Sequence, residues 1–253
     1  MLWITDVGQG PPLVLLHPVG TSGSIWWQHV PRLAKRFRVL AVDLPGHGRS
    51  PQPKEPLSLE GMADELHRRL QSLPILSPVH LLGLSLGGMV AQVFGVEHPS
   101  CVASLILCDT ICEVAPSLAT ILEERARVVE KEGMIATASS TLDRWFAPGF
   151  SARHADVTGE VERLLLAADS SVNAQTWRAI SRLSVAARLD TLKHLPAMVI
   201  NGALDDSIPK GVGQRLAGLL SARLVELPGC RHMAPLEAPE AFMDLVESFV
   251  LRG

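Results

Sequence analysis

Short apolar runs alternate with longer helix-like segments along most of the 253-residue chain. Each run is bounded by polar or turn residues, which is typical of strands buried on both faces of a parallel sheet. The runs are 13–16, 39–42, 79–82, 105–107, 197–200 and 224–227, and the helix-like segments are 59–73, 89–97, 212–220 and 239–250. Because right-handed crossovers connect such strands, the alternation predicts an α/β fold with a doubly wound, mostly parallel sheet.

Residues 113–194 interrupt this alternation, since they contain no convincing strand. A segment of this length is too long for a plain loop in a compact domain. Its helix-like stretches, recognised by charge and apolar spacing, are 123–127, 163–166 and 177–180. We therefore predict a helical cap at 113–194, inserted after the sixth strand and lying over one end of the sheet. Residues 1–112 and 195–253 would form the main part of the domain, and the cap would share its hydrophobic core.

Composition excludes several classes of function. The formal net charge is −3 without a Lys/Arg cluster, which argues against nucleic-acid binding. The four cysteines have no metal-ligand spacing and are expected to be reduced, mostly buried thiols, so we predict no metal site. We expect no organic cofactor either. The longest uncharged apolar stretch, 81–96, is shorter than the roughly 20 residues of a membrane span. The N-terminus lacks the features of a signal peptide, so a cytoplasmic protein that does not bind membranes is expected.

The sequence Gly83-Leu84-Ser85-Leu86-Gly87-Gly88 follows a predicted strand and opens a predicted helix. In this context G-x-S-x-G forms a sharp turn that holds the serine hydroxyl at the carboxyl edge of the sheet. The amide of Leu86 falls at the helix N-terminus, where an unpaired N–H can face an oxyanion. Ser85 is therefore the candidate nucleophile.

A serine nucleophile requires a base, which a third group orients, in the chain order serine, acid, histidine. His232 lies in a loop between the last predicted strand and the last predicted helix and is the candidate base. Asp205 and Asp206 follow the strand at 197–200, and we favour Asp205 as the acid. Asp109, at the end of the strand at 105–107, is a weaker second candidate.

A second oxyanion donor is expected in the loop after the first of these strands. His17-Pro18-Val19-Gly20 occupies this place, and because Pro18 has no N–H, the amide of Val19 is the natural donor. His47 lies in a glycine- and proline-rich loop before the nucleophile, so we interpret it as structural.

In combination, these motifs resemble the α/β-hydrolase superfamily, from about residue 13 to the C-terminus. The motifs are HPVG (17–20), DLPGHGRS (43–50), GLSLGG (83–88), NGALDD (201–206) and GCRHMAPLEAPEAF (229–242). Within the superfamily the chain is most similar to the 3-oxoadipate enol-lactonase group, through Glu132-Gly133-Met134, LDRWFAP (142–148) and GLSLGGMVAQ.

The resemblance implies the α/β-hydrolase fold and a triad of Ser85, Asp205 and His232, with oxyanion amides at Val19 and Leu86. Such enzymes usually have an extra strand ahead of residues 2–5, so seven or eight strands are expected. HPVG departs from the commoner HG opening of the family, which leaves the substrate open.

The expected function is hydrolysis of a small-molecule ester or lactone, such as a 3-oxoadipate enol-lactone, through an acyl-enzyme. A carbon–carbon bond hydrolase of the same fold and a ligand sensor with little turnover are the alternatives, and a homo-oligomer is left open. Candidate substrate-binding residues, for which core packing is the competing interpretation, are Trp26, Met89, Arg144, Trp145 and Met233. Arg144 is the informative one, because an arginine would favour a substrate with a free carboxylate.

Overall fold

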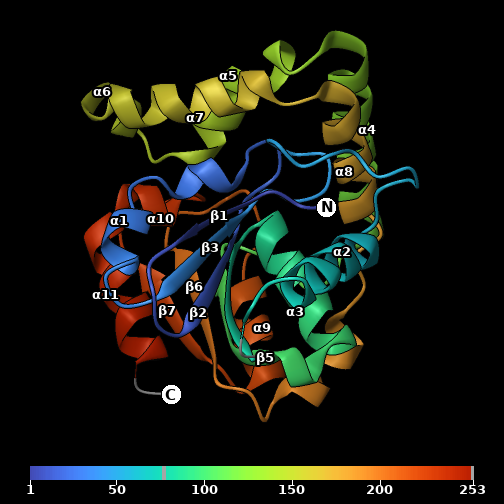
Figure 1. Cartoon of the computed structure of the whole chain (residues 1–253). Coiled ribbons are helices and arrows are strands. Elements are labelled where there is room, and N and C mark those ends of the chain that lie inside the picture. The colour runs from blue at the N-terminus through green and yellow to red at the C-terminus, as the bar shows by residue number, and fades with distance from the viewer. Residues whose placement is uncertain (76–77, 252–253) are drawn as a thin grey trace.

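A seven-stranded sheet runs through the centre of the protein (Figure 1) in the computed structural model, which describes residues 1–75 and 78–251. The strand order is β1-β3-β2-β4-β5-β6-β7. β1 is antiparallel to β3, and the other neighbouring strands are parallel. The strands are β1 (Ile4–Val7), β2 (Pro12–Leu16), β3 (Arg38–Val42), β4 (Val79–Leu84), β5 (Val102–Cys108), β6 (Ala197–Gly202) and β7 (Arg223–Leu227). The predicted doubly wound, mostly parallel sheet is confirmed, with seven strands.

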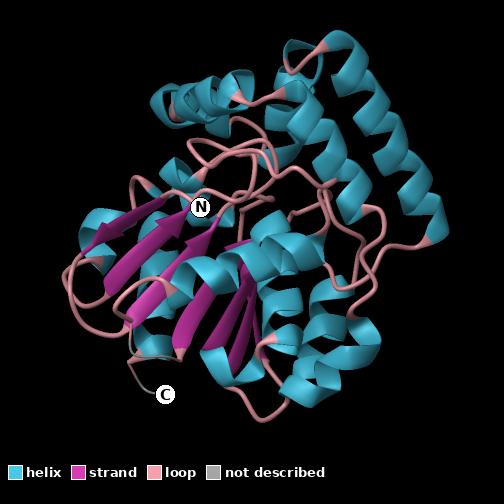
Figure 2. Cartoon of the chain, turned by 45° about the vertical axis from the view of Figure 1, so that its right-hand side comes forward, coloured by secondary structure: helices cyan, strands magenta, loops and turns pink. Residues whose placement is uncertain are grey.

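Helices cover both faces of the sheet (Figures 1 and 2). One face carries α1 (Val30–Leu33) and α11 (Pro239–Val250), and the other carries α2 (Leu59–Gln71) and α3 (Leu86–Glu97). The guanidinium of Arg32 on α1 joins the first pair by an ion pair of 2.9 Å to Glu247 on α11. The remaining core elements are η1 (Gly23–Trp26), η2 (Pro99–Cys101), η3 (Ala186–Leu192), α9 (Val212–Leu220) and α10 (Ala234–Glu237).

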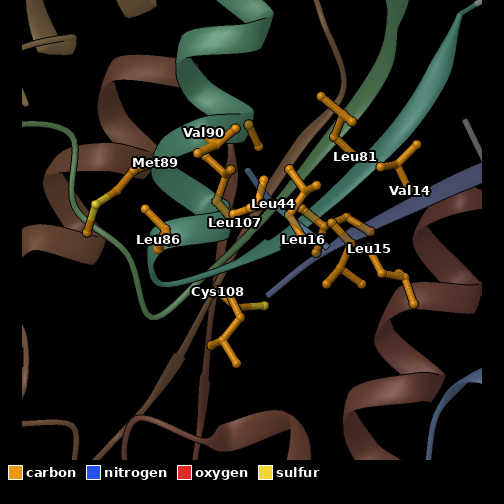
Figure 3. Packing of buried hydrophobic residues seen from close by; sticks show 14 of the residues in the cluster. Val14, Leu15, Leu16, Leu44, Leu81, Leu86, Met89, Val90, Leu107 and Cys108 are labelled. Atoms are coloured by element: carbon orange, nitrogen blue, oxygen red, sulfur yellow. The ribbon is translucent and has the colours of Figure 1, made fainter. Parts of the chain in front are cut away.

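The packed centre lies where β2, β4 and β5 meet α3 (Figure 3). Leu15, Leu81 and Leu107 on the strands have no exposed surface, and neither do Leu86 and Val90 on α3. A helix that is apolar on every side must be buried. This burial fixes α3, and therefore the turn that precedes it, against the carboxyl ends of the central strands.

The segment between β5 and η3 is helical and lies across the top of the sheet in Figure 1. Its helices are α4 (Pro116–Glu132), α5 (Ile135–Trp145), α6 (Phe150–Arg153), α7 (Ala155–Ala167) and α8 (Ser170–Ile180). α4 and α8 pack together, and Arg178 on α8 joins them through an ion pair of 2.7 Å with Glu130. The insertion follows the fifth strand and not the predicted sixth, because a single strand, β1, precedes β2 in the described residues.

Two further predictions concern cysteines and membranes. The four cysteines are free, and Cys108, Cys112 and Cys230 are buried, as expected for reduced thiols in a core. Within residues 1–75 and 78–251, no helix is long and apolar enough to span a bilayer.

Candidate active site

Ser85 occupies a strained turn between β4 and α3. Its φ is 54°, a left-handed conformation that few residues other than glycine adopt. Hydrogen bonds on both sides hold the turn: the Ser85 N–H donates to the Cys108 carbonyl at 2.9 Å, and the Thr110 hydroxyl donates to the Ser85 carbonyl at 2.7 Å. The backbone conformation of this serine is therefore imposed by its surroundings, which is characteristic of strain at a functional site.

The glycines around Ser85 allow strand and helix to approach closely. A Cβ atom on Gly83 would lie 2.3 Å from the carbonyl carbon of Gly87, and one on Gly87 would lie 2.3 Å from the carbonyl oxygen of Leu16. Both contacts are with backbone atoms at distances that real Cβ atoms do not adopt, so a side chain at either position would force the turn open. The G-x-S-x-G spacing is thus a steric requirement of the turn.

His232 and Asp205 form a buried hydrogen-bonded pair. The Nδ1 atom of His232 lies 2.9 Å from Oδ2 of Asp205, and the side chains are 4% and 1% exposed. A second oxygen of Asp205, Oδ1, accepts a hydrogen bond of 2.8 Å from the Ser207 N–H. Asp206 points elsewhere: it is exposed and lies 3.3 Å from Arg231. Of the two adjacent aspartates, only Asp205 contacts the histidine.

The electrostatics of Asp205 favour its charged form. Burial acts to raise the pKa of this carboxyl, but the charge and hydrogen bond of His232, with the hydrogen bonds from Ser207, leave it below its ordinary value. A charged Asp205 accepts the Nδ1 proton of His232, so Nε2 is the ring nitrogen that remains to act as a base. His232 and Ser85 line the same small cavity.

Asp109, the weaker candidate for the acid, is fully buried and accepts a hydrogen bond of 2.7 Å from the Gly202 N–H. Burial, followed by the charge of Asp205, raises its pKa well above the ordinary value. It does not contact His232.

The loop that carries Val19 is anchored by His17. The Leu44 N–H donates to Nε2 of His17 at 3.0 Å, so Nδ1 carries the ring proton and donates it to the Pro18 carbonyl at 2.8 Å. Complete burial lowers the pKa of His17 to about 4, although the hydrogen bond to Pro18 opposes the shift. A neutral imidazole therefore sets the loop beside the cavity, which Val19 lines.

Two cavities meet beneath the cap helices. The smaller, of about 50 Å³, is lined by Ser85, Met89 and His232, and the larger, of about 390 Å³, lies among α4, α5 and α8. The residues that line both are Val19, Arg125, Arg144, Trp145 and Trp177. Met89, Arg144 and Trp145, three of the predicted substrate-binding residues, line the small cavity together with Ser85.

Trp26 and Met233, two of the predicted substrate-binding residues, line neither of these cavities and are buried. The Trp26 indole is 1% exposed and stacks on Phe242, because η1 turns it toward α11. Met233 is fully buried, and its N–H donates to the Trp145 carbonyl at 3.0 Å. His47, which the sequence led us to interpret as structural, lies away from Ser85: it lines a separate cavity, and its Nδ1 is 3.0 Å from the Pro45 carbonyl oxygen. Burial, followed by the neighbouring His17, lowers its pKa to about 3.

Arg125 and Trp177 line both cavities but were not predicted as site residues. Arg125 lies in the charged run 123–127, which looks like a solvated helix face. The available signal was its position at i+3 from Leu122 and i−4 from Val129, both buried, which places it on the inward stripe of α4. The number of charged residues in this run made the inward position of Arg125 hard to recognise from the sequence.

The described residues do not meet the requirements of a metal site. In residues 1–75 and 78–251, no group of three or more His, Cys, Asp or Glu side chains could hold an ion.

Comparisons with known proteins agree with this fold. A model of the "Alpha/beta hydrolase family" matches residues 13–245. The chain is 25% identical to 3-oxoadipate enol-lactonase 2 of Acinetobacter baylyi, covering 96% of this chain and 89% of that protein. It is 31% identical to a pimeloyl-[acyl-carrier protein] methyl ester esterase of Aeromonas hydrophila, covering 96% of each. The crystal structure of the enol-lactonase from Burkholderia xenovorans LB400 superposes with a TM-score of 0.91 at 29% identity, covering 99% of this chain and 96% of that one.

Proposed function

The chain belongs to the α/β hydrolase family, and from this premise we propose that it is a serine hydrolase that cleaves a carboxylic ester or lactone through an acyl-enzyme. The observation that carries the proposal is the buried His232–Asp205 pair of 2.9 Å, whose histidine lines the same cavity as Ser85. Its relatives in the family include hydrolytic enzymes with ester and lactone substrates in their names.

In the first step, Oγ of Ser85 attacks the carbonyl carbon while Nε2 of His232 takes the hydroxyl proton. Asp205 holds the imidazole in the required tautomer and stabilises the imidazolium that forms. The carbonyl oxygen becomes an oxyanion, for which the N–H groups of Val19 and Leu86 are the donors. One such donor contributes about 2.7–4 kcal/mol to the transition state.

Collapse of the tetrahedral intermediate breaks the ester bond, and His232 returns its proton to the leaving oxygen. An alcohol departs from an ester, whereas the leaving oxygen of a lactone stays on the acyl chain. Water then gives a proton to His232 and attacks the acyl-enzyme, which releases the carboxylic acid and restores Ser85.

The two named relatives differ in their substrates, one a lactone and the other a methyl ester. Both bonds are cleaved by the same acyl chemistry, so the catalytic residues support each equally. We favour a lactone of the 3-oxoadipate enol-lactone type, because the similarity to the lactonase group extends to the cap sequence around Arg144 and Trp145. The alternative is a linear ester.

The proposal is tested with p-nitrophenyl acetate and butyrate and with a fluorophosphonate probe that labels active serines. The wild type should hydrolyse the esters and react with the probe, and Ser85→Ala should lose both, with turnover falling at least about 10⁴-fold. Ser151→Ala, an exposed serine on α6, is the matched control and should behave as the wild type does.

Equal turnover by the wild type and Ser85→Ala would overturn the proposal. Turnover of dienoic diketones without ester hydrolysis would favour carbon–carbon bond cleavage. Tight ligand binding with a large rise in Tm but no turnover would favour a sensor.

A further inference from the structure

A further cavity, of about 440 Å³, lies between the core and the cap, and Ser85 and His232 are not among its lining residues. The loops that follow β2 and β3 line one side of it, and α7 and α8 line the other. We call it the polar cavity, because its lining includes Thr21, Asp43, His47, Arg49, Asp169 and Asn173. Its volume lies within the roughly 300–1,000 Å³ of cavities that bind small molecules.

Two buried hydrogen-bond acceptors in this lining have no partner among residues 1–75 and 78–251. They are Nε2 of His47 and Oδ1 of Asn173, on residues that are 4% and 3% exposed. The nearest partner of Nδ1 of His47 is the Pro45 carbonyl oxygen at 3.0 Å, which can only accept, so Nδ1 carries the ring proton and Nε2 is an acceptor. A buried acceptor without a donor costs free energy, so both atoms favour a donor from outside the protein.

The other buried polar groups of the lining already have partners within the protein. The Asp43 carboxylate accepts two backbone N–H groups, at 2.7 and 2.8 Å. The hydroxyl oxygens of Thr21 and Ser22 have partners at 2.9 and 2.7 Å. The hydrogen-bonding capacity that the buried lining leaves unused is therefore that of His47 and Asn173.

The charged side chains of the lining balance one another. Asp43 and Asp169 are acidic, and Arg49 and Arg163 are basic. The Arg163 guanidinium also pairs with Glu160, at 2.8 Å between Nε and Oε2. This balance favours neither an anion nor a cation, whereas a neutral molecule with several hydroxyl groups can donate to both unpaired acceptors.

We propose that the polar cavity is a second binding site of this protein, and that it binds a neutral polyhydroxyl compound whose hydroxyl groups donate to Nε2 of His47 and Oδ1 of Asn173. Asn173 also lines the cavity among α4, α5 and α8, so its side chain lies between the two spaces. The loop after β2 closes against this side chain at Gly20, where a Cβ atom would lie 2.9 Å from Nδ2 of Asn173. A compound in the polar cavity is thus outside the space that Ser85 lines, and the inference does not depend on the hydrolase proposal.

Isothermal calorimetry of the wild type with xylitol, a linear polyol, tests the inference. Xylitol should bind saturably, whereas diglyme, a linear ether of similar length, should not bind, because its oxygen atoms carry no hydrogen to donate. The KM for p-nitrophenyl acetate should be the same with and without saturating xylitol, since the two occupy different cavities. Equal binding of diglyme, or xylitol that competes with the ester, would overturn the inference.

Two substitutions remove one acceptor each. Asn173→Leu and His47→Asn should each weaken xylitol binding by roughly 5- to 10-fold. The amide in His47→Asn can still donate to the Pro45 carbonyl, so this variant loses only the Nε2 acceptor. Asn173→Leu should have a Tm at least equal to that of the wild type, because it removes an acceptor that has no partner; a purely structural amide would instead lower the Tm on removal.

Gln175→Leu is the matched control. Gln175 lies on α8 like Asn173 but outside the lining of the polar cavity, so this variant should bind xylitol as the wild type does. Unchanged xylitol affinity in both Asn173→Leu and His47→Asn, or an equal loss in Gln175→Leu, would contradict the assignment.

A crystal structure with xylitol locates the compound directly. Its hydroxyl groups should lie within about 3.2 Å of Nε2 of His47 and Oδ1 of Asn173. Water molecules at both atoms, without xylitol in the cavity, would show that solvent satisfies these acceptors and would refute the inference. Binding of sulfate at Arg49 and Arg163 without binding of xylitol would assign the cavity to anions instead.

Discussion

Asp109 and Asp205 follow neighbouring parallel strands, β5 and β6, and the charge of Asp205 raises the pKa of Asp109. Only Asp205 contacts His232, and its pKa lies below the ordinary value. Asp109 is fully buried, and burial together with the charge of Asp205 favours its protonated form. One carboxylate is thus charged and the other neutral within the same buried pair.

This difference predicts opposite results for the same substitution at the two positions. Asp205→Asn should lower kcat by about 10⁴-fold, because the amide stabilises the wrong tautomer of His232. Asp109→Asn replaces a neutral carboxyl by a neutral amide that still accepts the Gly202 N–H, so kcat should stay within about 3-fold of the wild-type value. Steady-state kinetics on p-nitrophenyl butyrate measures both. A larger loss in Asp109→Asn than in Asp205→Asn would assign the acid to Asp109.

His17 predicts a loss of stability in acid. Its pKa is about 4 in the folded protein, below the ordinary histidine value of 6.5, so the folded state binds the proton less readily than the unfolded state does. The stabilisation is complete above pH 6.5 and is lost as the pH falls toward 4, by roughly 2–3 kcal/mol between pH 7 and 4.5. Urea denaturation of the wild type should show this decline.

His17→Gln can still accept the Leu44 N–H but does not titrate, so its free energy of unfolding should fall less over the same range. His194→Gln, an exposed histidine, is the control and should follow the wild type. Parallel curves for the wild type and His17→Gln would contradict the assignment, and the acid sensitivity would then come from other groups, such as His29 and His47, whose pKa values are lowered to about 4 and about 3.

Two glycines predict a contrast in stability. An added methyl group on Gly87 would lie 2.3 Å from the Leu16 carbonyl oxygen, whereas one on Gly159, within α7, would meet nothing within 4 Å. Gly87→Ala should therefore lose at least about 3 kcal/mol of unfolding free energy, and the esterase activity with it. Gly159→Ala should gain about 0.5–1 kcal/mol, because alanine favours the helix. Urea denaturation distinguishes the two, and a stable, active Gly87→Ala would disprove the steric argument.

Glu237 predicts a link between the cap and the histidine loop. One of its oxygens accepts the Ala147 N–H at 2.7 Å and the other accepts the Arg231 N–H at 2.6 Å, so it joins the end of the LDRWFAP segment to the residue before His232. Glu237→Ala leaves both amides without an acceptor, at a cost of about 1–3 kcal/mol for each if it stays buried. We expect a lower Tm and a kcat reduced by about 10-fold, since His232 is held less firmly.

Glu240→Ala is the control for this experiment. Glu240 is an exposed carboxylate near Glu237 that pairs with Arg32, and exposed ion pairs contribute at most about 1 kcal/mol. Its kcat should match that of the wild type. A Glu237→Ala variant with an unchanged kcat would show that the loop keeps its geometry without this link.

Local patterns in the sequence determined the fold class and the places of Ser85 and His232. Apolar runs of strand length indicate burial on both faces of a sheet, and the glycines around Ser85 indicate a turn that excludes side chains. Each of these signals is contained in a few consecutive residues. The order of strand, serine, helix and late histidine then placed the two residues at one edge of the sheet.

Tertiary structure alone decided which of several equivalent residues meet. Asp205 and Asp206 are neighbours of the same type, and only the packing of the loop after β6 turns one toward His232 and the other toward Arg231. Trp26 and Trp145 are equally good pocket residues by composition, but η1 directs one into the core and α5 directs the other over the cavity. Arg125 and Arg144 converge because α4 and α5 fold together above the sheet. Such contacts join residues far apart in the chain. The direction of each side chain there depends on how whole helices and strands pack, and the local periodicity of the sequence does not contain this information.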